Sequence, residues 1–248
     1  MPGITSLCTA YWKEALNLKR NQPQHFRRFE LLRFLPRWIR SLDGRAGPLA
    51  DELPWITFAA IQFLKKNLRP EMSVFEYGSG GSTLFFSRRV KQIFSVEHDP
   101  LWYEKVAQAI KNSQRKNCQL VVHEPIPDPL TAGKDPSDPA AYISTDERFH
   151  DQSFHAYATA IDSHPSQTFD VVMVDGRARP SCVKHGLEKV KAGGFLIVDN
   201  AERSEYQRSY LQLANPHWAR QDLMGPGPYN PYFWQTTIWK RLSESSNS

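Results

Sequence analysis

The feature that most constrains the fold of this chain is an alternation of short apolar runs with helical stretches between residues 73 and 199. The runs are Ser73–Tyr77, Gln92–Glu97, Gln119–His123, Phe169–Val174 and Gly194–Asp199. Runs that are apolar almost throughout predict strands buried on both faces, which is typical of a parallel sheet. The predicted crossover helices between them cover residues 82–89, 101–112, 146–161 and 179–190.

The C-terminal segment breaks this rhythm. The runs His217–Leu223 and Phe233–Arg241 predict two further strands, and the loop between them is rich in Pro and Gly. Strands joined by so short a loop pair antiparallel. We therefore predict an α/β fold with a doubly wound, mostly parallel seven-stranded sheet, a C-terminal antiparallel strand pair and an N-terminal helical extension.

The N-terminal segment has helical character. Residues 11–42 predict one or two helices because apolar residues recur at helical spacing, and Pro36 is expected to end or kink the second. Residues 43–48 predict a loop by composition, and a further helix is expected over Pro54–Leu68.

The net charge of +5 is concentrated in this segment. Residues 11–45 hold nine Lys/Arg and three Asp/Glu, a net charge of +6, which leaves −1 for the rest of the chain. We therefore separate a basic helical extension, residues 1–53, from a domain that spans residues 54–248. Such an extension could bind nucleic acid or an anionic membrane surface, although a basic run is more often a solvated helical face.

The sequence also carries signals of location. No run of about 18 apolar residues occurs, so no membrane span is expected. The N-terminus lacks the apolar core of a secretion signal. The three cysteines, Cys8, Cys118 and Cys182, form neither a CxxC pair nor a disulfide framework. We predict a cytoplasmic protein.

A glycine-rich loop follows the first apolar run. Its residues are Glu76, Tyr77, Gly78, Ser79, Gly80, Gly81, Ser82 and Thr83. Glycines between a strand and a helix permit a tight turn and let a ligand approach the backbone. A phosphate-binding P-loop would need a Gly-Lys-Ser/Thr ending, and a dinucleotide fingerprint would need Gly or Ala where Thr83 stands.

Acidic residues mark the ends of the first two runs. Glu76 stands two positions before the first glycine, and Glu97 follows it by 21 residues at the end of the next predicted strand. A carboxylate in this place suits a cationic ligand better than a phosphate. An acid at the second strand end can accept hydrogen bonds from ribose hydroxyls, and His98 could line the same pocket.

The pattern Glu76-x-Gly78-x-Gly80, with five parallel strands and an antiparallel pair, resembles the class I methyltransferases that use S-adenosylmethionine (SAM). The resemblance covers residues 54–241 and implies a Rossmann-like SAM-binding domain. It implies that SAM contacts the glycine-rich loop, Glu97 and His98, with its adenine near Glu124 at the third strand end. SAM carries a sulfonium and an ammonium group and no phosphate, which agrees with the acid before the glycines.

The fourth and fifth predicted strands also end in polar residues, Asp175 and the pair Asp199–Asn200. The carboxyl ends of parallel strands meet at one edge of the sheet, so these acids should converge with Glu76 and Glu97 on one crevice.

Asp175, Asp199 and Asn200 also resemble the metal ligands of catechol- and caffeoyl-CoA-type O-methyltransferases. This resemblance implies a divalent cation such as Mg²⁺, bound by oxygen atoms. Those families usually have a Lys shortly after the first Asp, whereas this chain has Arg177 and Arg179. The two arginines could grip an acidic substrate or lie in solvent at the start of a helix.

We predict an enzyme that transfers a methyl group from SAM to a small molecule, with a preference for an acceptor oxygen. Asp175 and His98 are the candidate general bases, and Asp175 is also expected to contact the cofactor. The alternatives are aminopropyl transfer by the same fold, and a non-catalytic module that contacts nucleic acid through its basic arm. A nucleic-acid substrate is disfavoured because the strand end VDGRA does not resemble the NPPY-type or DPPY-type motifs.

Three segments are expected to wall the substrate: the N-terminal arm, the insert at residues 125–165 and the loop at residues 225–236. The arm should cap the active site or form a homodimer contact. The aromatic residues of the loop could form a lid or wall, or pack on the core instead.

Overall fold

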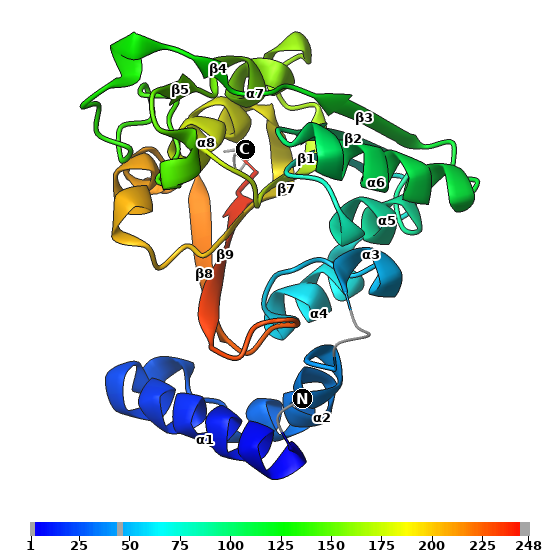
Figure 1. Ribbon diagram of the computed structural model, residues 1–248, viewed down its shortest axis with the longest axis vertical. Coiled ribbons are helices and arrows are strands. Elements are labelled where there is room, and N and C mark those ends of the chain that lie inside the picture. The colour runs from blue at the N-terminus through cyan, green and yellow to red at the C-terminus, as the bar shows by residue number, and fades with distance from the viewer. Residues whose placement is uncertain (1–2, 44–46, 244–248) are drawn as a thin grey trace, which may run out of the picture.

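A computed structural model of the protein describes residues 3–43 and 47–243 (Figure 1). Seven strands form one sheet in the order β3-β2-β1-β6-β7-β9-β8. They are β1 (Ser73–Tyr77), β2 (Gln92–Glu97), β3 (Cys118–Val122), β6 (Phe169–Val174), β7 (Val190–Asp199), β8 (Trp218–Gly225) and β9 (Trp234–Arg241). The first five run parallel, whereas β9 pairs antiparallel with both β7 and β8. The predicted fold class is confirmed.

Helices cover both faces of this sheet (Figure 1). The α-helices are α1 (Ile4–Asn21), α2 (Arg28–Ser41), α3 (Pro48–Asp51), α4 (Phe58–Asn67), α5 (Gly81–Ser87), α6 (Pro100–Asn112), α7 (His155–Thr159) and α8 (Arg179–Gly186). Phe75 and Tyr77 of β1 belong to a core shared with α7, α8 and the 3-10 helix η6 (Ser204–Leu213). Val74 belongs to the opposite core, shared with α1, α2, α4 and α5. Burial on two faces explains the continuous apolar runs.

The segment predicted as one helix over residues 146–161 is divided into shorter elements, so this prediction is wrong. They are the 3-10 helix η3 (Glu147–Phe149), β5 (Gln152–Ser153), α7 and the 3-10 helix η4 (Ala160–Ser163); β5 pairs with β4 (Ile126–Pro127). Asp151 has a left-handed backbone with φ of 56°, which interrupts any helix. The other predicted helices of the domain are present with shifted ends, and α4 begins four residues later than expected.

Pro36 lies inside α2 and does not end it, contrary to the first of the two expectations for this residue. Leu31, Phe34 and Trp38 are buried on one face of the helix, before and after the proline. Pro36 and Leu32 lie on the exposed face. Pro36 has no N–H to donate to the Leu32 carbonyl, but water can reach this carbonyl on the exposed face. The packing of the buried face therefore outweighs the lost hydrogen bond.

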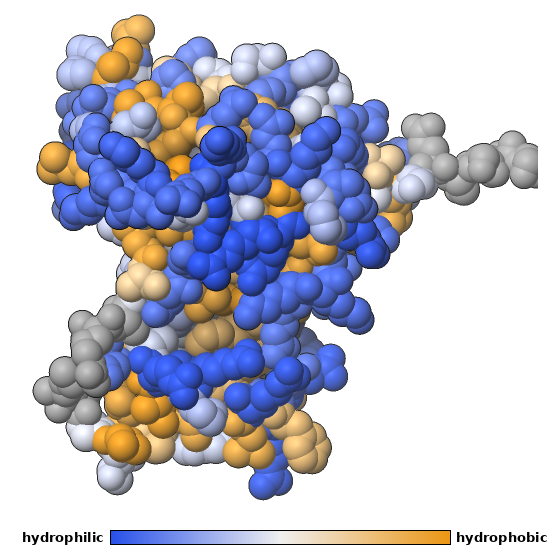
Figure 2. Space-filling view, turned by 90° about the vertical axis from the view of Figure 1, so that its right-hand side faces the viewer, coloured by the Kyte–Doolittle hydropathy of each residue, from blue (hydrophilic) through white to orange (hydrophobic). Residues whose placement is uncertain are grey.

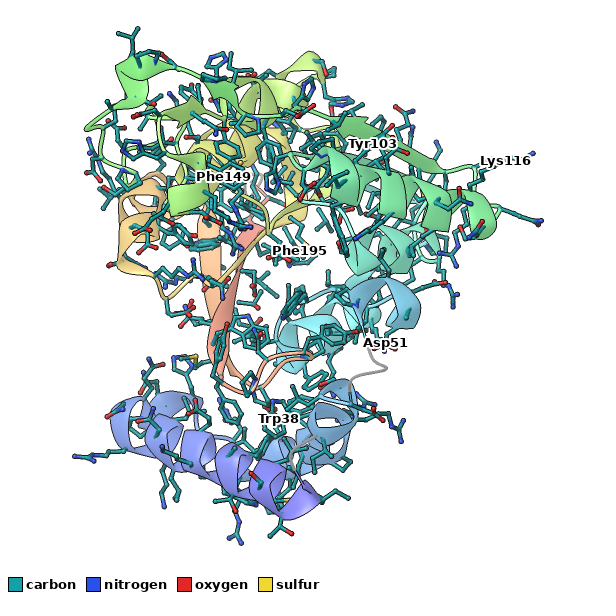
Figure 3. All side chains as sticks on the ribbon, in the orientation of Figure 1. Trp38, Asp51, Tyr103, Lys116, Phe149 and Phe195 are labelled. Atoms are coloured by element: carbon teal, nitrogen blue, oxygen red, sulfur yellow. The ribbon has the colours of Figure 1, made fainter. Side chains whose placement is uncertain are left out.

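The N-terminal helices pack beneath the loop that joins β8 and β9 (Figure 1). The indole N–H of Trp38, labelled in Figure 3, donates to the Asn230 carbonyl at 2.9 Å. The Glu14 carboxylate accepts from the Phe233 N–H at 3.3 Å. None of residues 3–43 lines the cavity described below, so this part of the extension supports the hairpin loop, whereas Pro48 of the extension does line the cavity.

The surface of the arm mixes hydrophilic and apolar side chains (Figure 2). Ile4, Leu16, Phe29 and Leu32 are among its exposed apolar residues. No helix within the described ranges is long and apolar enough to cross a membrane. Residues 44–46 of the predicted loop lie outside the described residues. The division at residue 53 and the homodimer contact stay predictions.

Candidate functional site

A cavity of about 680 Å³ opens at the carboxyl ends of β1, β2, β6 and β7. This volume lies within the range of about 300–1,000 Å³ that is typical of ligand sites. Glu97, Asp175 and Asp199 line it from three different strands. The sheet thus brings together three of the four acids predicted to converge, and the fourth, Glu76, lies outside the lining.

The glycine-rich loop forms one wall of the cavity through Gly78, Ser79, Gly80, Gly81 and Ser82. Gly78 has a φ of 90°, and a Cβ there would lie 3.0 Å from the Cα of Gly176. A side chain at this position would press the two loops apart. The backbone can therefore follow this path closely only with glycine.

Glu76 supports the loop from below. Its side chain is fully buried, and Oε1 accepts hydrogen bonds from the hydroxyls of Thr83 and Ser95. Thr83 Oγ1 in turn accepts from the Gly80 N–H at 3.0 Å. Glu76 Oε2 is buried and has no hydrogen-bond partner among the residues that the structure describes. Burial raises the pKa of Glu76 to about 7, so the carboxyl group is partly protonated near neutral pH.

This raised pKa has a consequence for stability. The folded state holds the Glu76 proton more tightly than the unfolded chain, so stability falls as pH rises from about 4.5 to about 7. The full effect is about 3 kcal/mol at 1.4 kcal/mol per pKa unit. Glu76→Gln, which cannot ionise, should flatten the pH dependence of the unfolding free energy. Urea titrations at pH 5 and pH 8 measure it.

The exposed Glu104→Gln on α6 is the matched control and should keep the wild-type slope. An unchanged slope in Glu76→Gln would show that this carboxyl group titrates normally in the folded protein.

Glu97 fixes the tip of the loop. Its Oε2 accepts from the Ser79 N–H at 2.9 Å and the Ser79 hydroxyl at 2.8 Å. Trp102 donates its indole N–H to the Ser79 carbonyl at 2.8 Å. Burial raises the pKa of Glu97, but hydrogen bonds from His98 and Ser79 outweigh it and hold the pKa below its ordinary value. Glu97 is therefore an ionised acceptor in the cavity wall.

His98 lies beside Glu97 in the same wall. Its Nδ1 is 2.8 Å from Glu97 Oε1. Its ring packs against Phe149, labelled in Figure 3, at a centroid distance of 5.4 Å, and against Phe154. The imidazole is thus held by aromatic packing on one side and by a carboxylate on the other.

Arg179 occupies the space between Asp175 and Asp199. Its side chain is 7% exposed. Nη2 donates to Asp175 Oδ1 at 3.2 Å, Nε donates to the Gly176 carbonyl at 3.0 Å, and Nη1 donates to the Asp199 carbonyl. It is therefore a buried internal cation, which contradicts the expected solvated position, whereas a grip on an acidic substrate stays a prediction because Arg179 lines the cavity. Arg177 pairs with Asp146 at 3.2 Å.

The two carboxyl groups beside Arg179 differ in their partners. Asp199 Oδ1 accepts from the Trp234 indole N–H at 2.8 Å and the Thr236 hydroxyl at 2.7 Å. Burial raises the pKa of Asp199 to about 6. Burial and the charge of Asp199 raise the pKa of Asp175 well above its ordinary range, and Arg179 opposes this. Asp175 is the less tightly engaged of the two.

The predicted metal site does not fit these residues. Among the residues that the structure describes, no three His, Cys, Asp or Glu side chains are grouped to hold a metal ion. Arg179 places a positive charge against Asp175, where a metal site would need open ligand oxygens. Asp199 Oδ1 already accepts two hydrogen bonds. The donor set therefore disfavours a divalent cation.

The cavity lining also includes residues that the sequence analysis did not name individually, some of them in the insert that it expected to form a wall. Trp55 precedes α4, and Arg203 and Tyr206 follow β7. Pro136 and the segment 143–146 come from the predicted insert. No local motif marks these residues, because only the fold brings them together.

The loop at residues 225–236 contributes both to the cavity lining and to the core, and its role as a substrate wall stays a prediction. Asn230 and Tyr232 line the cavity, whereas Trp234 is buried in the fold. The loop at residues 225–236 therefore connects one wall of the cavity to the core of the domain.

Four predicted cofactor residues lie outside the cavity lining. Glu76 and Thr83 are buried beneath the loop, and Tyr77 donates its hydroxyl to the Ala158 carbonyl at 2.8 Å. Glu124 is exposed at the surface. Glu76, Thr83 and Tyr77 can therefore affect a bound ligand only through the glycine-rich loop.

Known proteins share this fold without close sequence similarity. No protein-family model matches the chain, and no curated protein is similar to it in sequence. A protein from Clostridium thermocellum described as an rRNA methylase has a TM-score of 0.52 at 10% identity, over 75% of this chain and 96% of its own.

Two further solved structures give the same result. A protein from Streptococcus mutans described as a methyltransferase, in complex with SAH, has a TM-score of 0.50 at 14% identity, over 73% of this chain and 96% of its own. An rRNA methylase from Streptococcus thermophilus has a TM-score of 0.50 at 11% identity, over 75% of this chain and 95% of its own. The fold is that of class I SAM-dependent methyltransferases. These structures do not show the narrower likeness to catechol-type O-methyltransferases.

Proposed function

We propose that this protein is a SAM-dependent methyltransferase whose acceptor is a small molecule. The observation that carries the proposal is the cavity that joins the glycine-rich loop to the acids at three strand ends. The complex of the similar Streptococcus mutans protein with SAH (S-adenosylhomocysteine, the product of SAM after methyl transfer) supports the choice of cofactor.

The cavity offers suitable groups for SAM. Gly78 and Gly80 present backbone without side chains, and the ionised Glu97 offers an acceptor for ribose hydroxyls. Both Glu97 oxygens already accept hydrogen bonds from the protein. A ribose hydroxyl would therefore take the place of the Ser79 hydroxyl. His98, held by Glu97, and Trp102 would form the wall on this side.

Asp175, which lines the cavity, is the proposed general base. Burial and the charge of Asp199 raise the pKa of Asp175, which makes its carboxylate a stronger proton acceptor than an exposed one. Bound SAM supplies an electrophilic methyl group, and the acceptor oxygen bonds to this carbon while the carbon–sulfur bond breaks and its electron pair goes to sulfur. The acceptor proton goes to Asp175. Arg179 positions the Asp175 carboxylate through the 3.2 Å hydrogen bond.

A transfer assay tests this proposal. The protein is incubated with methyl-labelled SAM and a pool of phenols, hydroxy acids, sugars, amino-acid derivatives and tRNA. We expect label in a small molecule at an equal rate with and without EDTA, because Arg179 supplies the positive charge between the acids. A rate that falls at least tenfold with EDTA and returns with Mg²⁺ would contradict the metal-free site. Label in tRNA alone would contradict the small-molecule acceptor.

A further inference from the structure

Besides the proposed cofactor residues, the cavity lining contains a second set of residues. This inference rests on the proposed function and concerns the acceptor. The set assigned here to the acceptor is Trp55, Asn200, Arg203, Tyr206, Asn230 and Tyr232, all of which line the cavity.

The charges of the cavity lining point to the kind of ligand it can bind. The four carboxylates that line the cavity already have partners within the protein. Glu97 accepts from Ser79, Asp146 pairs with Arg148 and Arg177, and Arg179 contacts Asp175 and Asp199. The lining acids are thus neutralised or satisfied by their own neighbours.

Arg203 is the exception among the lining arginines. It is exposed, and among the described residues no carboxylate lies within ion-pair distance of it. Its guanidinium lies 5.9 Å from the Tyr206 ring centroid, and Nη1 is 3.4 Å from the Tyr206 hydroxyl. The buried Arg179 lies over the same ring at 5.7 Å. Arg203 is therefore held in place with donors left for an anion.

The cavity lining also contains exposed aromatic surface. Trp55 is 43% exposed and Tyr232 is 48% exposed, although both are large aromatic side chains. Each is supported by another ring: Tyr229 lies 5.6 Å from Trp55, and Trp234 lies 6.0 Å from Tyr232. Fixed aromatic faces in a cavity favour contact with a planar or apolar part of a ligand.

We propose that the acceptor is a small molecule that combines a planar ring with an anionic group. The anionic group binds Arg203, and the ring contacts Trp55 and Tyr232. The side-chain amides of Asn200 and Asn230 lie in the same lining and can bond to polar substituents on the ring.

The shape of the site favours this class over a nucleic acid strand. Besides the segment with Asn200, Arg203 and Tyr206, three further segments wall the cavity: Pro48 and Trp55, the insert through Pro136 and residues 143–146, and the hairpin loop. A nucleic acid carries a negative charge on every phosphate and is bound through several cations along its path. Arg203 alone, among the described lining arginines, has no acidic partner.

The test measures binding and does not require turnover. SAH-saturated protein is titrated with pairs of ring compounds that differ in charge: 4-hydroxybenzoate and 4-hydroxybenzamide, 4-hydroxycinnamate and its amide, indole-3-acetate and its amide, and phenyl phosphate and phenol. We expect at least one anion to bind about tenfold more tightly than its neutral partner, the usual effect of a charge-assisted pair. Arg203→Gln should remove this preference.

Arg69→Gln is the matched control, because Arg69 is also exposed and does not line the cavity; it should keep the preference. Trp55→Leu should weaken the binding of the charged and the neutral compound of each pair to the same extent. The proposal is overturned if no anion is preferred, if the preference survives Arg203→Gln, or if a short RNA binds through Arg203 more tightly than every ring compound. SAH binding is measured separately, and the titrations are repeated without it. Loss of SAH binding with the ring preference intact would contradict only the proposed function.

Discussion

Gly80→Val should weaken SAH binding by at least about 100-fold, which corresponds to about 2.7 kcal/mol. Gly80 has φ of 159° and ψ of −137°, a conformation that is essentially restricted to glycine. A Cβ there would lie 3.6 Å from the Trp102 ring, on the wall proposed to hold the cofactor. The branched side chain would both displace the loop and fill ligand space. Calorimetric titration with SAH measures the effect.

Gly193→Val provides the control for backbone strain. Gly193 has φ of 80°, a Cβ added there would meet no atom within 4 Å, and the residue does not line the cavity. This variant should lose thermal stability, as Gly80→Val does, yet bind SAH as the wild-type protein does. Equal SAH affinity in Gly80→Val and wild type would remove the loop from the cofactor site.

Arg179→Leu should destabilise the protein by about 3–5 kcal/mol, the range for removing one partner of a buried ion pair. The change leaves Asp175 and Asp199 without their cation, and three backbone carbonyls lose a donor. The loss of stability should be smaller at pH 5 than at pH 8, because protonation of Asp175 and Asp199 removes their uncompensated charge. Urea unfolding at the two pH values measures it.

Two comparisons make the Arg179 result specific. Arg179→Leu combined with Asp199→Asn should recover part of the lost stability, because one buried charge is gone. Arg88→Leu removes an arginine that is 55% exposed and paired with Glu52, and should cost no more than about 1 kcal/mol. A loss below this level for Arg179→Leu would contradict the role of Arg179 as a buried counter-charge.

The sheet could be predicted closely from the sequence, because burial on both faces leaves an unbroken apolar signal. The bounds of β1, β2 and β6 agree with the predicted strands residue for residue. The helix expected over residues 146–161 failed because Asp151 takes a left-handed conformation that periodicity does not reveal. Pro36 lies inside a helix because tertiary packing outweighs a local preference.

The site could be predicted only in part, because some of its residues are brought together only by the tertiary structure. Glu97, Asp175 and Asp199 converge because parallel strands place their carboxyl ends at one edge. The burial of Arg179 between two acids depends on how α8 begins after β6, which no motif records. Trp55, Arg203 and Tyr232 lie far apart in the sequence, so their common cavity follows from the tertiary structure alone.

Calorimetric titration of the wild-type protein with SAH tests the central claim most directly. The glycine-rich loop and Glu97 predict one binding site per chain with a dissociation constant in the micromolar range. A complete absence of binding heat at several temperatures, with folded protein at about 100 µM, would correspond to an affinity too weak for a cofactor site. That result would contradict the assignment of this cavity to SAM.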